Sequence, residues 1–193
     1  MSAAVCPFLA PAAALKKRHS RKETFQCAGR ILSQNFVTGF AMNIEIVAEP
    51  VGFRLHGIRG TVANDRFGEV GLRLMNEMWQ MVRSRGIATT GINHWVYLDA
   101  KELFVGVELT DGEPIAAAGA LEPIEILLPR YARHLHVGAY QALSLKWRDF
   151  RAELASLGER VSLPSLEIYG HHCDAPSLLE TTLLIGLMAK PLG

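Results

Sequence analysis

The strand-like segment Leu166-Glu167-Ile168-Tyr169 places a carboxylate and a phenol two residues apart in an apolar stretch. Alternate side chains of a strand share a face, so Glu167 and Tyr169 should lie on one face and the aliphatic residues on the other. A carboxylate among aromatic rings favours flat molecules with delocalised positive charge, because stacking and cation–π contacts contribute roughly 0.5–2 kcal/mol each when desolvated. Glu167 is therefore the candidate for orienting a ligand and selecting its charge.

A matching segment, His94-Trp95-Val96-Tyr97, lies 72 residues earlier and places Trp95 and Tyr97 at the corresponding alternate positions. If the aliphatic residues of both segments pack under a helix, the other four side chains should face a shared cleft on the side away from that helix. The alternative is that Glu167 is a solvated strand residue and the aromatic residues are ordinary core. The pattern alone leaves both interpretations open.

A strand, a helix and two further strands are predicted in the first half of the folded region. Asn64 and Asp65 offer a helix N-cap, apolar residues then recur at intervals of three and four, and Gly86 ends the helix. The segment from Gly57 to Gly60 is interpreted as a turn, because it lacks the strand–loop–helix context of a nucleotide site. The predicted strands cover residues 44–62, with a bend at 50–52, residues 94–98 and residues 103–110.

The same order recurs in the second half. The predicted elements are a strand over 124–137 with a bend at Pro129, a helix over 140–157 that Gly158 ends, and strands over 166–170 and 179–187. Gly86 and Gly158 are also 72 residues apart. We therefore predict an α+β fold of duplicated β-α-β-β units related by a pseudo-two-fold axis. Each unit is expected to form an antiparallel sheet with a helix on one face, and pairing of the halves to cover the other face around a central ligand cleft.

Composition predicts one globular domain behind a basic arm. The chain has 193 residues, of which 49% are hydrophobic, and a net charge of +1. Residues 1–41 hold six basic residues and one acid, so the remainder, with 14 basic and 18 acidic residues, has net charge −4. We expect residues 1–41 to be a flexible tail or a segment upstream of the true start, and residues 42–193 to be the domain, with halves 44–110 and 123–188. Its mildly acidic body argues against direct nucleic-acid binding.

Three cysteines, Cys6, Cys27 and Cys173, have no metal-type spacing and indicate a reducing compartment, so a cytoplasmic location is expected. No apolar run approaches the ~20 residues of a spanning helix, so no membrane association is expected. His134 and His136 alternate on a strand, but two ligands are too few for a metal site. Neither a metal nor a cofactor is predicted.

The order of motifs in the second half resembles the GyrI-like effector-binding family. Residues 133–140 (RHLHVGAY) end in the pattern His-x-Gly-x-Tyr, a helix containing Trp147 follows, and residues 164–169 (PSLEIY) match Pro-x-x-Glu-x-Tyr. The resemblance is good over about 123–187, weaker over 44–110, and does not include residues 1–41.

This resemblance implies a duplicated β-α-β-β fold whose hydrophobic cleft binds lipophilic, often cationic, compounds, here without an attached DNA-binding domain. It gives Glu167 the role of the cleft glutamate, Tyr140 that of the motif tyrosine and Trp147 that of the helix aromatic. The final strand departs from the family pattern because it lacks an aromatic residue, and Glu180 is a candidate second carboxylate. The predicted ligand-binding residues are Glu167, Tyr169, Trp95, Tyr97, Tyr140 and Trp147.

Three functions are compatible with these features. The first is non-catalytic binding of a lipophilic aromatic molecule, such as a cationic drug, toxin or effector. The second is hydrolysis of cyclopropane-bearing or similar electrophilic natural products, with Glu167 as general acid or base and Tyr140 as a hydrogen-bond donor. The third is a gyrase-inhibitor-type interaction module whose partner is DNA gyrase or a separate regulator. The sequence does not separate binding from hydrolysis.

Overall fold

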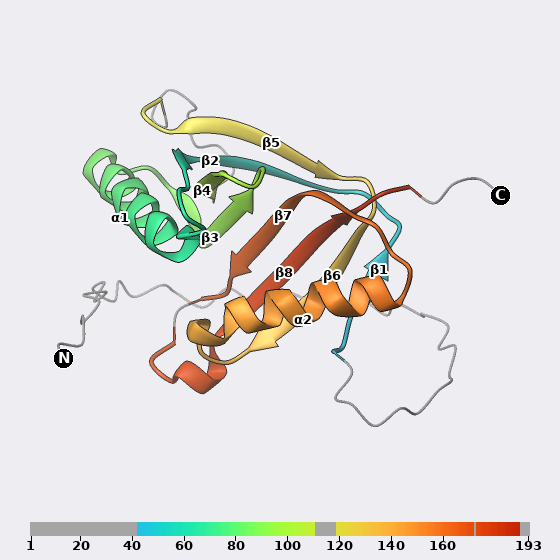
Figure 1. Ribbon diagram of the computed structural model, residues 1–193. Coiled ribbons are helices and arrows are strands. Elements are labelled where there is room, and N and C mark those ends of the chain that lie inside the picture. The colour runs from blue at the N-terminus through green and yellow to red at the C-terminus, as the bar shows by residue number, and fades with distance from the viewer. Residues whose placement is uncertain (1–41, 111–118, 172, 190–193) are drawn as a thin grey trace, which may run out of the picture. The chain divides into compact units, whose positions relative to one another are not determined.

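The computed structural model describes residues 42–110, 119–171 and 173–189. The predicted arm and most of the predicted linker between the halves lie outside these residues. The described chain forms one eight-stranded antiparallel sheet with two α-helices, which confirms the α+β class (Figure 1). The strands are β1 (Glu45–Val47), β2 (Val51–Thr61), β3 (Thr89–Tyr97), β4 (Glu102–Leu109), β5 (Glu122–Leu128), β6 (Tyr131–Val137), β7 (Val161–Tyr169) and β8 (Glu180–Leu187). The helices are α1 (Phe67–Arg85) and α2 (Leu143–Ser156), and short 3₁₀ turns cover Tyr140–Ala142 and Pro176–Leu178.

The strand order reveals the duplication. It reads β1-β6-β8-β7-β3-β4-β2-β5. If each strand is replaced by its counterpart in the other half (β1 with β5, β2 with β6, β3 with β7 and β4 with β8), the same order is obtained in reverse. The axis of this symmetry passes between β3 and β7, which pair with Trp95 directly opposite Glu167. These two residues are the equivalent positions of the two halves, so the pseudo-two-fold axis brings them together.

The two halves form a single sheet, not two. The predicted strand over 44–62 is divided into β1 and β2, and the predicted strand over 124–137 into β5 and β6. Prolines occupy both divisions, Pro50 and Pro129, where a missing N–H interrupts ladder pairing. The first piece of each pair joins the other half, since β1 pairs with β6 and β5 pairs with β2. Each half is therefore β-β-α-β-β and lends its first strand to its partner half.

Both helices lie on the same face of the sheet. Under α1, Leu74 and Met78 pack with Trp95, and under α2, Phe150 packs with Leu183. The register places Trp95, Glu167 and Leu183 side by side on one face, so the two helix cores share it.

The opposite face carries a third core, which includes Leu55, Leu128, Leu166 and Leu184. Leu55 and Leu128 come from β2 and β5 at one end of the sheet, Leu166 comes from the central strand β7, and Tyr131 on β6 near the other end belongs to the same core. The sheet therefore bends around this core and covers the face itself. The predicted orientation of β7 is therefore wrong: Leu166 and Ile168 pack into the third core, while Glu167 and Tyr169 point to the helix-bearing face.

The start of α1 also differs from its prediction. Asn64 and Asp65 adopt positive φ angles of 53° and 55°, and Arg66 precedes the helix without a side-chain capping bond. The predicted helix end is confirmed, because Gly86 adopts the left-handed conformation at φ 63°. In the described part of the chain, neither helix combines the length and apolarity needed to cross a membrane.

The segment from Gly57 to Gly60 lies inside β2 and is not a turn. A Cβ atom at Gly57 would lie 2.0 Å from the carbonyl oxygen of Val105 on β4. Glycine is required there because the two strands approach too closely for any side chain.

Candidate functional site

Glu167 lies at the centre of the sheet and is only 3% exposed. Its carboxylate accepts hydrogen bonds from the indole N–H of Trp147 and from the hydroxyl of Tyr169, and Tyr97 contributes a further hydrogen-bonding contact. Within the described ranges, no basic side chain forms an ion pair with Glu167. The carboxylate is thus buried and held by neutral donors.

Burial has the larger effect on the ionisation of this residue. Removal from water raises the pKa of Glu167, while the bonds from Tyr169, Trp147 and Tyr97 act in the opposite direction without cancelling the shift. Burial, followed by the nearby Glu167 charge, raises the pKa values of Tyr97 and Tyr169 well above 10. Both phenols therefore remain protonated and can donate at neutral pH.

Aromatic rings surround this carboxylate. The ring centroids of Trp95 and Tyr169 are 5.4 Å apart, those of Tyr97 and Trp147 are 5.7 Å apart, and those of Tyr140 and Tyr169 are 5.2 Å apart. The structure thus brings together all six residues predicted from the sequence. We call Glu167 and these five rings the Glu167 cluster.

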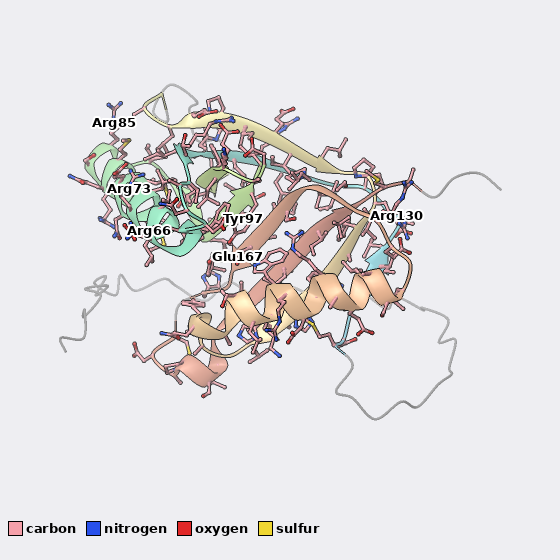
Figure 2. The ribbon with its side chains drawn as sticks, viewed as in Figure 1. Arg66, Arg73, Arg85, Tyr97, Arg130 and Glu167 are labelled. Atoms are coloured by element: carbon pink, nitrogen blue, oxygen red, sulfur yellow. The ribbon has the colours of Figure 1, made fainter. Side chains whose placement is uncertain are left out.

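Three elements position the cluster. Strands β3 and β7 supply its floor, and α2 with the 3₁₀ turn before it supplies Trp147 and Tyr140. Tyr97 and Glu167 lie close together between α1 and α2 in Figure 2. Helix α1 approaches β3 closely at Gly71, where a Cβ atom would lie 2.3 Å from the Trp95 ring. The side chains that complete the site therefore depend on the packing of both helices.

Sequence reasoning missed two neighbours of the cluster. Phe67, the first residue of α1, packs on Tyr97 with ring centroids 5.3 Å apart. The guanidinium carbon of Arg151 lies 5.6 Å from the centroid of the Trp147 ring. A signal for Arg151 was present, because residues four apart on a helix are neighbours. No comparable signal pointed to Phe67, whose contact depends on how α1 packs over β3.

The proposed second carboxylate is not part of the cluster. Thr181 pairs with Tyr169 and shares its face, so Glu180 points to the other face, where it is exposed. The prediction of a second carboxylate at Glu180 is therefore wrong. Leu183 lies opposite Glu167 on β8, which makes this wall aliphatic.

The two strand histidines have backbone partners. His134 Nδ1 lies 3.0 Å from the Asn43 carbonyl oxygen, and His136 Nε2 lies 3.3 Å from that of Ala139. Over the residues that the structure covers, no three His, Cys, Asp or Glu side chains are grouped to hold a metal ion.

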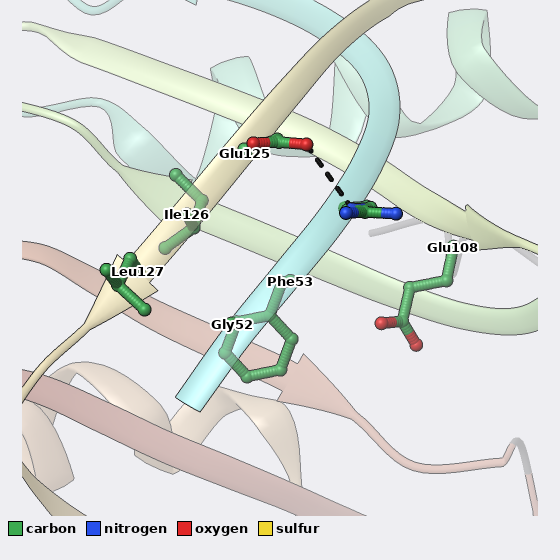
Figure 3. Close-up of a pocket in the computed structure, with 7 residues that line it drawn as sticks. Gly52, Phe53, Glu108, Glu125, Ile126 and Leu127 are labelled. Carbon is green, nitrogen blue, oxygen red and sulfur yellow. Dashed lines mark ion pairs between the residues drawn. The ribbon is translucent and has the colours of Figure 1, made fainter. Parts of the chain in front are cut away.

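A separate depression of about 500 Å³ lies along β2 and β5 (Figure 3). Its wall includes the ion pair of Arg54 and Glu125, whose side chains are 3.3 Å apart and largely exposed. The lining residues are Gly52, Phe53, Arg54, Glu108, Glu125, Ile126 and Leu127. None of them belongs to the Glu167 cluster.

No family model matches the sequence, and no curated protein matches it. Several solved structures are similar in fold. An uncharacterized conserved protein from Listeria innocua aligns with TM-score 0.54 and 10% identity over 75% of this chain and 92% of its own. The EcmrR C-terminal domain aligns with TM-score 0.54 and 14% identity over 76% of this chain and 99% of its own. SAV2435 bound to tetraphenylphosphonium aligns with TM-score 0.50 and 16% identity over 76% of this chain and 93% of its own. The chain therefore shares the α+β fold of these neighbours.

Proposed function

We propose that residues 42–193 form a GyrI-like effector-binding domain that binds a lipophilic, cationic aromatic molecule at Glu167. The observation that carries this proposal is a buried carboxylate surrounded by aromatic rings, with no ion-pair partner among the described residues. An unpaired buried charge is unfavourable, so a ligand cation that replaces the missing partner gains a strong interaction.

The rings of the cluster supply the second part of the recognition. A cation over an aromatic face gains roughly 0.5–2 kcal/mol, and apolar ring surface adds to this. Leu183 and the cores beside the cluster add aliphatic surface. SAV2435, which shares the fold, is a protein bound to the lipophilic cation tetraphenylphosphonium.

Ligand entry requires the rings to move. Glu167 is 3% exposed, and Trp147 and Tyr169 already donate to its oxygens. Tyr140 lies at the rim, because 37% of its surface is exposed and it stands in the turn before α2. We propose that Tyr140 and Trp147 swing aside, so that the ligand takes the place of the indole N–H at the carboxylate.

Titration of the protein with tetraphenylphosphonium, followed by tryptophan fluorescence, tests this proposal. Glu167→Gln should weaken binding at least tenfold, since it removes the charge and keeps the shape. Glu180→Gln, an exposed carboxylate on the opposite face, is the matched control and should bind like the wild type. Binding should also weaken as the pH falls through the raised pKa of Glu167, because protonation neutralises the site.

Two further comparisons sharpen the test. Neutral triphenylphosphine oxide should bind more weakly than the cation; equal binding of both compounds, or full affinity in Glu167→Gln, would overturn the proposal. Mass spectrometry of the recovered ligand should show it unchanged. Hydrolysis is the second candidate function, because a carboxyl group with a raised pKa can act as a general acid or base. Formation of a product from a cyclopropane-bearing compound, lost when Glu167 is replaced, would support it.

A further inference from the structure

Three buried polar side-chain atoms close to Glu167 have no hydrogen-bond partner in the described chain. They are the indole nitrogen of Trp95 and the hydroxyls of Ser165 and Thr181. The three residues are 6%, 1% and 0% exposed, respectively. One other such atom, His56 Nδ1, lies on β2 and is not part of this group.

Sheet register gathers these three residues around Glu167. Trp95 pairs directly with Glu167, Ser165 precedes it by two residues on the same strand, and Thr181 pairs with Tyr169. All of them point to the helix-bearing face. We call Glu167, Trp95, Ser165 and Thr181 the polar strip.

The orientation of Trp95 turns its N–H away from α1. The six-membered ring of the indole faces α1, since atoms Cε3, Cζ3 and Cη2 are those nearest to a Cβ built on Gly71. Nitrogen Nε1 belongs to the opposite, five-membered ring, which therefore faces away from Gly71. The Trp95 ring also lies 5.4 Å from the ring of Tyr169, which donates to Glu167.

The strip interrupts an otherwise apolar surface. On the same face, Leu103 and Val105 lie under α1, and Leu183 and Ile185 lie under α2. A buried hydroxyl without a partner destabilises the fold, and an aliphatic residue at position 165 or 181 would avoid that cost. Several unpartnered polar groups beside an unpaired carboxylate are characteristic of a site that stays polar for a ligand.

We propose that the ligand carries an oxygen hydrogen-bond acceptor beside its cationic centre, and that at least one of three donors recognises it: the Trp95 N–H, the Ser165 hydroxyl or the Thr181 hydroxyl. The ligand class is then a cationic aromatic compound bearing a carbonyl, ether or hydroxyl group. This inference rests on the proposed function, because Glu167 binds the cation. It adds that a cation whose substituents are all hydrocarbon, such as tetraphenylphosphonium, lacks the oxygen acceptor and leaves these donors without a partner.

A matched pair of ligands tests the inference on the intact protein. The first compound is triphenylphosphonium carrying a 4-acetylphenyl group, and the second carries a 4-isopropylphenyl group. The two have the same charge and a similar shape, but the first has a carbonyl oxygen where the second has a methyl group. Calorimetric titration of both, and of their ortho and meta isomers, should show at least one pair in which the acetyl compound binds about tenfold more tightly.

Three variants assign this preference to the strip. Trp95→Phe, Ser165→Ala and Thr181→Val each remove a polar atom, and at least one should reduce the preference toward unity. Ser165→Ala and Thr181→Val, which leave the rings intact, should keep the affinity for the isopropyl compound. Thr181→Val should also raise the Tm of the ligand-free protein by about 2–4 °C, because it removes an unpartnered hydroxyl. Thr182→Val, on the opposite face of the same strand, is the control and should leave the preference unchanged.

The outcomes separate this inference from the proposed function. If every acetyl compound binds no better than its isopropyl partner, and Glu167→Gln weakens both, the inference is wrong and the cation site stands. A preference that survives in all three variants would also overturn it. If neither compound of any pair binds, the proposed function and the inference are both wrong.

Discussion

At the scale of single residues, the site depends on an asymmetry between two equivalent positions. Trp95 and Glu167 occupy the same place in the two halves and meet at the pseudo-two-fold axis. A carboxylate at both positions would put two negative charges in contact without water, which is strongly unfavourable. A ring at one position and a carboxylate at the other instead forms a surface that suits one cation.

Glu167 should destabilise the free protein at neutral pH. Because burial raises its pKa above the ordinary value of 4.5, the folded state holds this proton more tightly than the unfolded state. Its contribution to stability is therefore most favourable in acid and is lost as the pH rises through the raised pKa. We expect Glu167→Gln to raise the Tm at pH 7, by about 2–4 °C for each kcal/mol of penalty removed, and to lose this gain near pH 4.

Thermal unfolding between pH 4 and pH 8 measures this effect. Glu180→Gln serves as the control and should show no gain that grows with pH, since its carboxylate is exposed. A gain for Glu167→Gln that does not change with pH would contradict the explanation.

Arg151 should weaken the binding of cations. Its guanidinium lies over the Trp147 ring. Its charge opposes the burial and the Glu167 charge that together raise the pKa of Tyr97, so its positive field reaches the cluster. We expect Arg151→Gln to tighten tetraphenylphosphonium binding about two- to fivefold at low salt, with a smaller effect at high salt. Arg148→Gln, an exposed arginine paired with Asp149 on the same helix, should change affinity less. Weaker binding in Arg151→Gln would show that this residue mainly holds Trp147 in place.

At the scale of elements, the close contact of α1 with β3 positions the cluster floor. Gly71 lets the helix backbone approach the Trp95 ring, which in turn packs on Tyr169. Gly68, one turn earlier on the same helix, is exposed and has open space around it. Replacing each glycine by alanine therefore distinguishes two effects: both substitutions change helix propensity, but only the one at Gly71 also disturbs packing.

Gly71→Ala should destabilise the domain by about 1–3 kcal/mol, because the added methyl group overlaps the Trp95 ring and forces the helix outward. Gly68→Ala should be neutral or stabilise it by up to about 1 kcal/mol, since alanine favours helix and meets no neighbour. Urea unfolding measures both free energies. Equal effects of the two substitutions would rule out the close contact.

At the scale of the whole domain, the two halves depend on each other. Each lends its first strand to the other, and the third core draws on strands from both. Neither half by itself can complete its sheet edge or cover its apolar face.

We therefore expect fragments separated within residues 111–118 to be largely unfolded alone and to fold when mixed. Circular dichroism of each fragment and of the equimolar mixture measures this. The mixture should regain the strand signal and bind tetraphenylphosphonium. A fragment that is monomeric and folds cooperatively alone would contradict the dependence.

Much of the fold could be predicted because the duplication and the ends of the helices leave local signals in the amino-acid sequence. Gly86 and Gly158 follow the two helices, and the segments around Trp95 and Glu167 became the two central strands. The errors arose where pairing over long distances decides. The start of the first helix and the close strand approach at the interior glycines of β2 depend on residues distant in the sequence. The prolines predicted bends in the two long strands, but not that the first piece of each would pair with the other half.

The sequence alone predicted Trp95, Tyr97, Glu167 and Tyr169, because alternation along a strand and a repeat of 72 residues are local properties of the chain. Tyr140 and Trp147 were predicted from the resemblance of the second-half motifs to the GyrI-like family. Only the tertiary structure decided which face they occupy. The helix-free face is covered by the bending of the sheet, so the aliphatic residues fill that interior and Glu167 turns toward the helices. The burial of its charge and the lack of a counter-charge also follow from packing, since they depend on which side chains surround it in space.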